Sequence, residues 1–221
     1  MSRPSPLPLD RMIRRVERYV RRWQEPYVTG ESRARRDPFR VLISCMLSLR
    51  TKDETTAAAS KRLFALADTP EGILRLNEKR IARTIFPVGF YNTKARNIRA
   101  ICRRLLDEYD GRVPDEIGDL LALPGVGRKT ANLVLTVGFG KPGICVDTHV
   151  HRISNRWGLV RTRTPEQTEM SLREVLPRRW WMEINNILVT FGQNCCTPLS
   201  PHCSTCPLKD DCPKVGVTRC R

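Results

Sequence analysis

The sequence predicts an all-α protein. Apolar residues recur at intervals of three and four along most of the chain, which is the spacing of one helix face. No segment shows the alternation of apolar and polar residues that a half-buried strand requires. Proline and glycine fall between the periodic segments, where they end helices and form turns. We therefore expect short helices joined by loops.

The first half of the chain contains most of the predicted helices. Residues 12–23 place apolar side chains on one face and arginines on the other, which favours a helix packed on a core over one lying on a membrane. Residues 39–49 are apolar nearly all round and predict a buried helix. Further helices are expected at 54–66, 71–76, 78–86 and 93–109.

The second half continues the same pattern. Thr164 and Pro165 form a typical cap and first-turn pair, which predicts a helix beginning there. The helices expected in this half cover 115–123, 128–139, 147–157, 166–176 and 179–191.

The charge of the chain indicates a polyanionic partner. Lysine and arginine number 39 against 23 aspartate and glutamate residues, giving a formal net charge of +16. Such an excess is typical of proteins that bind nucleic acids. No apolar run approaches the ~20 residues needed to cross a bilayer, and the N-terminus lacks an apolar signal core. We expect a cytoplasmic protein that binds no membrane.

Residues 123–129, Leu-Pro-Gly-Val-Gly-Arg-Lys, predict a phosphate-binding turn. Gly125 and Gly127 can adopt positive φ and let backbone N–H groups approach a phosphate oxygen closely. The helix expected to follow points its positive dipole end at the same anion. Lys129 falls in the first turn of that helix, where it can serve as a phosphate contact or as a nucleophilic amine.

Asp147 follows Lys129 by 18 residues, within the sequence Val-Asp-Thr-His-Val-His-Arg. Taken alone, an aspartate at the start of a predicted helix is a simple N-cap. Taken with the lysine, it supplies the carboxylate that can stabilise a developing positive charge on a sugar. The combination of the two residues therefore favours catalysis.

Four cysteines near the C-terminus predict a metal centre. Cys196, Cys203, Cys206 and Cys212 have the spacing C-x6-C-x2-C-x5-C. Thiolates suit both an iron–sulfur cluster and zinc, and the spacing does not separate the two. Cys195 competes for the first ligand position.

These motifs resemble the endonuclease III branch of the helix-hairpin-helix DNA glycosylases. LPGVGRKTAN is similar to the hairpin of that family and VDTHVHR to its acidic loop, and residues 47–53 and 88–95 resemble two DNA-facing segments. The resemblance implies a six-helix barrel at residues 31–141. It also implies a second helical domain formed by residues 1–30 and 142–221, with the active-site cleft between the two domains.

The resemblance also implies a chemistry. A bifunctional glycosylase and AP lyase is expected to remove oxidised pyrimidines, with Lys129 as the nucleophile and Asp147 as its acidic partner. A [4Fe–4S] cluster is expected on the four cysteines. The partner is duplex DNA that contains damaged bases or abasic sites, bound by a monomer.

The resemblance assigns DNA contacts to further residues. Arg50 stands where the family commonly has a glutamine that enters the gap left by the extruded nucleotide, which leaves the opposite-base preference open. Phe90 is either a second wedge or a buried core residue. The full set of expected DNA contacts is Arg50, Phe90, Lys94, Gly125, Gly127 and Arg128. Two other functions stay open: an AP lyase with weak or different base specificity, and a non-catalytic DNA-binding module.

Overall fold

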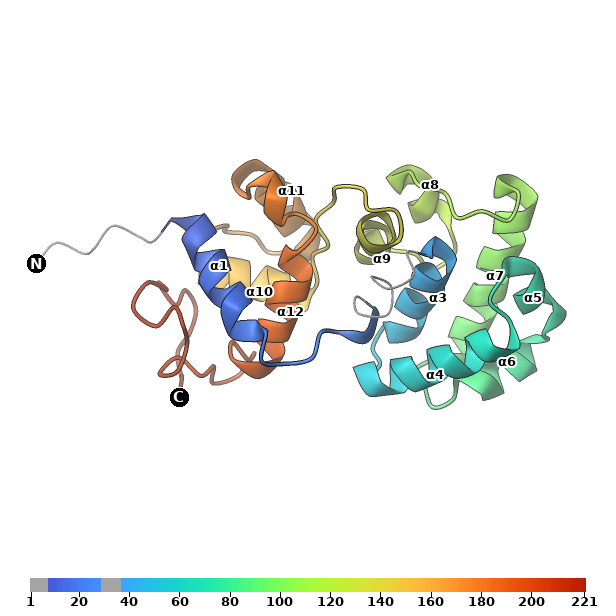
Figure 1. Ribbon diagram of the computed structural model, residues 1–221, viewed down its shortest axis with the longest axis horizontal. Coiled ribbons are helices and arrows are strands. Elements are labelled where there is room, and N and C mark those ends of the chain that lie inside the picture. The colour runs from blue at the N-terminus through green and yellow to red at the C-terminus, as the bar shows by residue number, and fades with distance from the viewer. Residues whose placement is uncertain (1–7, 29–36) are drawn as a thin grey trace, which may run out of the picture. The chain divides into compact units, whose positions relative to one another are not determined.

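The computed structural model describes residues 8–28 and 37–221, and within these ranges the regular structure is helical, with no β-strand (Figure 1). The fold class predicted from the sequence is confirmed. The helices are α1 (Leu9–Val20), α3 (Pro38–Ser48), α4 (Asp53–Leu66), α5 (Pro70–Arg75), α6 (Glu78–Ile85), α7 (Tyr91–Tyr109), α8 (Ile117–Ala122), α9 (Arg128–Leu133), the π-helical η1 (Val134–Gly138), α10 (Thr148–Arg156), α11 (Pro165–Val175), the 3-10 helix η2 (Arg178–Trp180) and α12 (Ile184–Asn194).

The chain divides into two compact units. One comprises Met1–Glu25 and Ile144–Arg221, and the other comprises Pro26–Gly143. The two are called here the terminal unit and the central unit. The domain boundary expected between residues 30 and 31 lies outside the described residues.

The central unit is built around α3. Asp37 caps this helix by accepting hydrogen bonds from the N–H groups of Phe39 and Arg40 at 3.0 and 3.1 Å. The helix contacts α4, α7, α9 and η1, which explains why it is apolar on every side. Its fully buried residues are Val41, Leu42, Ile43, Met46 and Leu47.

The 128–139 segment departs from its predicted single helix. The α-helical part ends at Leu133, and Phe139 N–H donates to the carbonyl of Val134, a spacing of five residues. A Cβ on Gly138 would lie 3.0 Å from the Cα of Pro38, so η1 packs directly against the backbone at the start of α3. The change of helix type accompanies this close contact, which local periodicity does not encode.

The terminal unit has its own apolar core, to which α1, α10, α11 and α12 contribute. The apolar face of α1 is buried in this core through Met12, Ile13, Val16 and Val20. The arginine-rich helix at residues 12–23 is therefore a packed helix with a basic outer face. Within the described part of the chain, no helix combines the length and apolar content that crossing a membrane requires.

Candidate functional site

The predicted hairpin is present between α8 and α9. Gly125 adopts φ +74°, and a Cβ there would lie 2.6 Å from the Nδ2 atom of Asn97, so this position requires glycine. Leu123 and Val126 are buried and anchor the turn to the central unit. Gly127 does not use the positive φ that is open to glycine, because it is the N-cap of α9 with φ −98°. Apart from its own chain neighbours, no atom of residues 8–28 and 37–221 would lie within 4 Å of a Cβ on Gly127, so the space beside it is open on the side that these residues form.

Lys129 is exposed in the first turn of α9, between half-buried Arg128 and buried Thr130. Burial raises the pKa of the Cys45 thiol on α3 to about 12, and the positive charge of Lys129 acts in the opposite direction. The Lys129 ammonium is thus within electrostatic range of α3. The fold holds the backbone of this lysine firmly while leaving its side chain at the surface.

Asp147 is the N-cap of α10, as its position predicts. One carboxylate oxygen accepts hydrogen bonds from the N–H groups of His149 and Val150 at 2.8 and 3.0 Å. The residues before it are buried, and the Asn185 side chain donates to the carbonyl of Cys145 at 3.1 Å. The orientation of this carboxylate is therefore set within the terminal unit, whereas Lys129 belongs to the central unit.

Arg50 and Phe90 come together at the surface of the central unit. Arg50 follows α3 and Phe90 precedes α7, and the arginine Cζ lies 5.7 Å from the centroid of the phenyl ring. Both residues have positive φ, 52° and 58°, which is uncommon for side chains of this size. Phe90 is 63% exposed, so the core role considered for it is wrong.

The DNA contact predicted for Lys94 is wrong, because the residue is buried at 5% exposure. Its Nζ donates to the carbonyls of Leu47 and Leu49 at 2.8 and 2.5 Å and to Thr51 Oγ1 at 3.1 Å. Burial lowers the pKa of Lys94 to about 8. A lowered pKa is typical of reactive amines, but an ammonium enclosed in this way is out of reach of a substrate.

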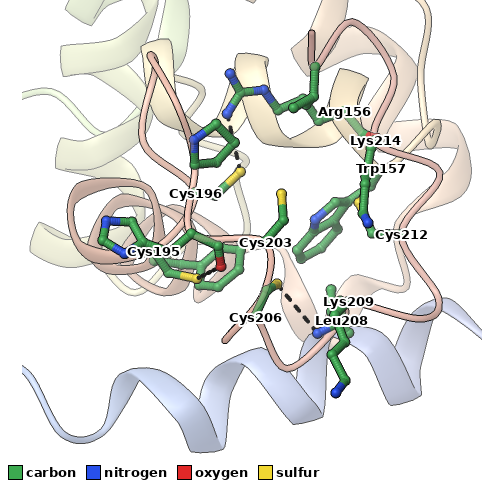
Figure 2. Close-up of a pocket in the computed structure, with 14 residues that line it drawn as sticks. Arg156, Trp157, Cys195, Cys196, Cys203, Cys206, Leu208, Lys209, Cys212 and Lys214 are labelled. Carbon is green, nitrogen blue, oxygen red and sulfur yellow. Dashed lines mark hydrogen bonds between the residues drawn. The ribbon is translucent and has the colours of Figure 1, made fainter. Parts of the chain in front are cut away.

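The C-terminal cysteines line one pocket of the terminal unit. Cys196, Cys203, Cys206 and Cys212 line it together with apolar side chains that include Trp157 (Figure 2). Cys195 also lies at its edge, but its thiol is directed to the carbonyl of His202 at 3.8 Å.

Two arginines on α10 hold the loop that carries Cys196. Arg152 donates to the carbonyls of Gly192 and Cys196 at 3.1 and 2.8 Å. Arg156 donates to the carbonyls of Thr197 and Pro198, each at 2.7 Å, and its Nη1 lies 3.4 Å from Cys196 Sγ. Sequence reasoning did not assign these roles. The sequence feature that could have indicated them is a pair of arginines four residues apart, which lie on the same face of the helix that Asp147 caps.

The arrangement of the thiols fits a cluster. Burial raises the pKa of the Cys203 thiol to about 11 and also raises that of Cys212, so both thiols hold their protons at neutral pH while the site holds no metal. A thiol that binds iron does so as the thiolate. Across residues 8–28 and 37–221, no three His, Cys, Asp or Glu side chains are grouped so that they could hold a metal ion. The four thiols line one pocket, and cysteine thiolates are the ligands that iron–sulfur clusters use.

Comparisons with known proteins agree with this geometry. Residues 43–178 match the HhH-GPD superfamily of base excision DNA repair proteins, and residues 196–212 match the iron–sulfur binding domain of endonuclease III. The second match begins at Cys196 and ends at Cys212, and Cys195 lies outside it.

Individual relatives cover most of the chain. Endonuclease III of Thermotoga maritima is 53% identical over 176 residues, which are 80% of this chain and 83% of that protein. A solved structure of a trapped endonuclease III–DNA covalent intermediate superposes with a TM-score of 0.83 at 34% identity, covering 93% of this chain and 94% of that one. A thermostable thymine-DNA glycosylase has a TM-score of 0.80 at 25% identity, with coverages of 93% and 95%.

The family match covers more than half of the chain, and the T. maritima relative is similar over most of its length. These likenesses exclude the non-catalytic module. The chain therefore belongs to the endonuclease III family, as a base excision repair DNA glycosylase and AP lyase with a [4Fe–4S] cluster.

Proposed function

We propose that this enzyme removes oxidised pyrimidines from duplex DNA and then cleaves the abasic strand through a Schiff base on Lys129. The observation that carries the proposal is the position of Lys129, exposed in the first turn of α9 directly after the hairpin. A hairpin with open space beside Gly127 lets a backbone phosphate approach the helix N-terminus. A phosphate bound there brings the sugar of the same nucleotide towards the neighbouring amine.

The proposed chemistry needs one nucleophile for two steps. The Lys129 amine attacks C1′ of the deoxyribose as the bond to the base breaks, and the base leaves with a proton. The resulting C1′ adduct opens to a Schiff base, which acidifies the hydrogen on C2′. Loss of that proton expels the 3′ phosphate by β-elimination and cuts the strand. A trapped covalent intermediate of a related endonuclease III with DNA supports a step of this kind.

Asp147 is proposed to supply negative charge during base removal. Its carboxylate can stabilise the oxocarbenium character of the sugar and accept a proton during the attack by the amine. The two hydrogen bonds from the start of α10 hold the orientation of this carboxylate.

The [4Fe–4S] cluster is proposed to bind Cys196, Cys203, Cys206 and Cys212. When bound, it cross-links a segment with little regular secondary structure. Arg156 orients the Cys196 loop for this purpose through its bonds to Thr197 and Pro198. The cluster is a structural element in this proposal and takes no part in the reaction at C1′.

The test for Lys129 is a covalent trap. Purified enzyme is mixed with duplex DNA carrying thymine glycol, or an abasic site, and the imine is reduced with borohydride. Wild type is expected to form a covalent adduct with both substrates, and Lys129→Ala is expected to form none. The matched control is Lys61→Ala, because Lys61 is an exposed lysine on α4 of the same unit. An adduct that survives in Lys129→Ala contradicts the proposal.

The test for Asp147 separates charge from capping. Asparagine is as good an N-cap as aspartate but carries no charge. Asp147→Asn is therefore expected to keep the thermal stability of wild type and to lose most of its glycosylase activity. Activity close to wild type in Asp147→Asn would mean that the residue only caps α10.

A second candidate is an AP lyase with weak or different base specificity. It is favoured by Arg50, which carries a charge where the family commonly has a neutral glutamine. A duplex panel with thymine glycol, dihydrouracil, uracil mispairs and a plain abasic site distinguishes the two. Cleavage of the abasic duplex alone would support the second candidate.

The enzyme is proposed to act as a cytoplasmic monomer on duplex DNA. The net charge of +16 supports DNA binding along the backbone. Light scattering coupled to gel filtration tests the oligomeric state, and a mass twice that of the 25.4 kDa chain would contradict it.

A further inference from the structure

Among the described residues of the central unit, Lys94 is the buried charged side chain, and the proposed chemistry leaves it without a role. It lies near the start of α7, four residues after Phe90, and its backbone N–H donates to the Phe90 carbonyl at 3.0 Å. Its Nζ reaches across to the opposite loop, which follows α3. A buried ammonium is costly unless every hydrogen finds an acceptor.

All three hydrogens of this ammonium have acceptors in the last turn of α3 and the loop after it. Two acceptors are the carbonyls of Leu47 and Leu49, at 2.8 and 2.5 Å, and the third is Thr51 Oγ1 at 3.1 Å. Because α3 ends at Ser48, these carbonyls belong to the end of a helix, where backbone oxygens lack partners and the dipole is negative. Lys94 therefore acts as a cap for α3 supplied by another helix.

Thr51 extends this network to the loop before α7. Its hydroxyl accepts from Lys94 Nζ and from Gly89 N–H, the latter at 3.2 Å, and it donates to the Leu49 carbonyl at 3.3 Å. A hydroxyl has one hydrogen to donate and two lone pairs, so all of its capacity is used. A Cβ on Gly89 would lie 2.8 Å from the Arg50 carbonyl oxygen, which shows how closely the two loops approach.

The exposed end of this assembly is the Arg50–Phe90 pair. Both residues have positive φ, a conformation that persists only where the surroundings impose it. The surroundings here are the bonds of Lys94 and Thr51 and the contact at Gly89. The arginine and the phenyl ring then project together, with the guanidinium 5.7 Å from the ring centroid.

We propose that Lys94 is a positioning residue that locks the two loops together, so that Arg50 and Phe90 enter the DNA stack as one rigid wedge while a damaged nucleotide is extruded. The inference rests on the proposed function, because it assumes that these two loops face DNA. It assigns the lysine to base extrusion and not to the reaction at C1′. An intact lesion needs that extrusion, whereas an abasic site has no base to unstack.

The test compares two substrates in Lys94→Met, which keeps the length of the side chain without its charge. Single-turnover rates are measured on thymine glycol duplex, and borohydride trapping is measured on abasic duplex. A 2-aminopurine placed opposite the lesion reports unstacking by its fluorescence. We expect Lys94→Met to lose about 10- to 100-fold in rate on thymine glycol and to lose the fluorescence rise. Trapping on abasic DNA is expected to stay near wild type, and Lys61→Met, a surface lysine, to match wild type throughout.

Thr51→Val is the second variant, because it removes the hydroxyl without changing the size of the side chain. It is expected to lose rate on thymine glycol duplex, by less than Lys94→Met does, and to keep trapping on abasic duplex. If Lys94→Met does not fold, Thr51→Val alone tests the inference. Wild-type rates on thymine glycol in a folded Lys94→Met, or equal losses on both substrates, overturn the inference. Wild-type behaviour of Thr51→Val beside an unfolded Lys94→Met also overturns it. A wild-type enzyme that traps no DNA at all instead overturns the proposed function.

Discussion

Two irregular regions of this enzyme, the paired loops around Arg50 and Phe90 and the C-terminal segment at residues 195–221, hold their shapes by different means. Each contains non-glycine residues with positive φ: Arg50 and Phe90 in the first, Ser200 and Lys214 in the second. The paired loops are held by one buried ammonium and one hydroxyl with all their hydrogen-bonding capacity used. The C-terminal segment instead encloses a pocket lined by thiols.

The two regions differ in what supplies hydrogen-bond partners and cross-links to backbone that lies outside regular helices. The paired loops lie at the ends of well-packed helices, and two side chains, Lys94 from α7 and Thr51 from the loop itself, join them. The C-terminal segment has few apolar contacts of its own beyond Leu208, and it depends on arginines from α10 and on a cross-linking group. We expect the first region to survive loss of the cofactor and the second to fail.

Removing one proposed cluster ligand is expected to have the largest effect. Cys206→Ala should contain little iron, and its C-terminal segment should become sensitive to proteases while the central unit stays protected, because only the former is built around the cluster. Iron content and limited proteolysis with mass spectrometry measure this. Cys102→Ala, which alters a fully buried thiol in α7 of the central unit, is the control and should keep its iron. A full iron content in Cys206→Ala would show that the ligand set is wrong.

Arg156→Met is expected to weaken the same region less severely. It removes two hydrogen bonds to the carbonyls of Thr197 and Pro198, and a hydrogen bond contributes about 0.5–1.5 kcal/mol net. Oxidant-induced loss of the visible absorption of the cluster should be about 10-fold faster than in wild type, which corresponds to 1.4 kcal/mol. Arg161→Met changes an exposed arginine and should match wild type. If the visible absorption is lost at the same rate in Arg156→Met and Arg161→Met, Arg156 does not stabilise the cluster region.

Alanine substitutions at the two hairpin glycines of the central unit are expected to differ in their effect on stability. Gly125→Ala must adopt φ near +74° with a Cβ close to Asn97, so we expect a loss of about 2 kcal/mol in the free energy of unfolding. Gly127→Ala keeps an ordinary φ and, among the described residues, meets nothing beyond its chain neighbours. The loss of a preferred N-cap residue and the gain from a less flexible unfolded chain oppose each other, so its stability should change by less than about 1 kcal/mol. Both should bind DNA more weakly, as measured by fluorescence anisotropy. Full DNA affinity in a stable Gly127→Ala would argue against phosphate binding at this turn.

The smallest expected effect is a dependence of stability on pH through Lys94. Burial lowers the pKa of Lys94 to about 8 in the folded protein from its ordinary value of 10.5, so between these two pH values the unfolded chain binds more protons. Stability from this group therefore rises as the pH rises, by about 1 kcal/mol from pH 7 to pH 9. Urea unfolding of wild type and Lys94→Met at both pH values should show that difference. If the stability of wild type relative to Lys94→Met falls between pH 7 and pH 9, the predicted direction of the pH dependence is wrong.

Some of these features were available from local sequence. The hairpin glycines, the aspartate before a helical repeat and the cysteine spacing each act over a few residues, where turn geometry and capping operate. Asp147 accordingly caps α10, and Gly125 adopts the positive φ that was predicted. The burial of α3 also followed from its composition, because a helix apolar on every side needs partners all round.

Other features depend on residues far apart in the sequence. Lys94 looked like one more basic residue in a DNA-facing segment, and only the packing of α7 against the end of α3 shows that its ammonium is enclosed. The α-helical part of the hairpin helix stops at Leu133, where the packing of Gly138 against Pro38 accompanies a π-turn. The sequence by itself determined the helices, the turn chemistry, the charge and the ligand spacing, because these are properties of neighbouring residues. The tertiary structure decided which charged groups reach solvent, since burial is a property of all the elements packed around a side chain.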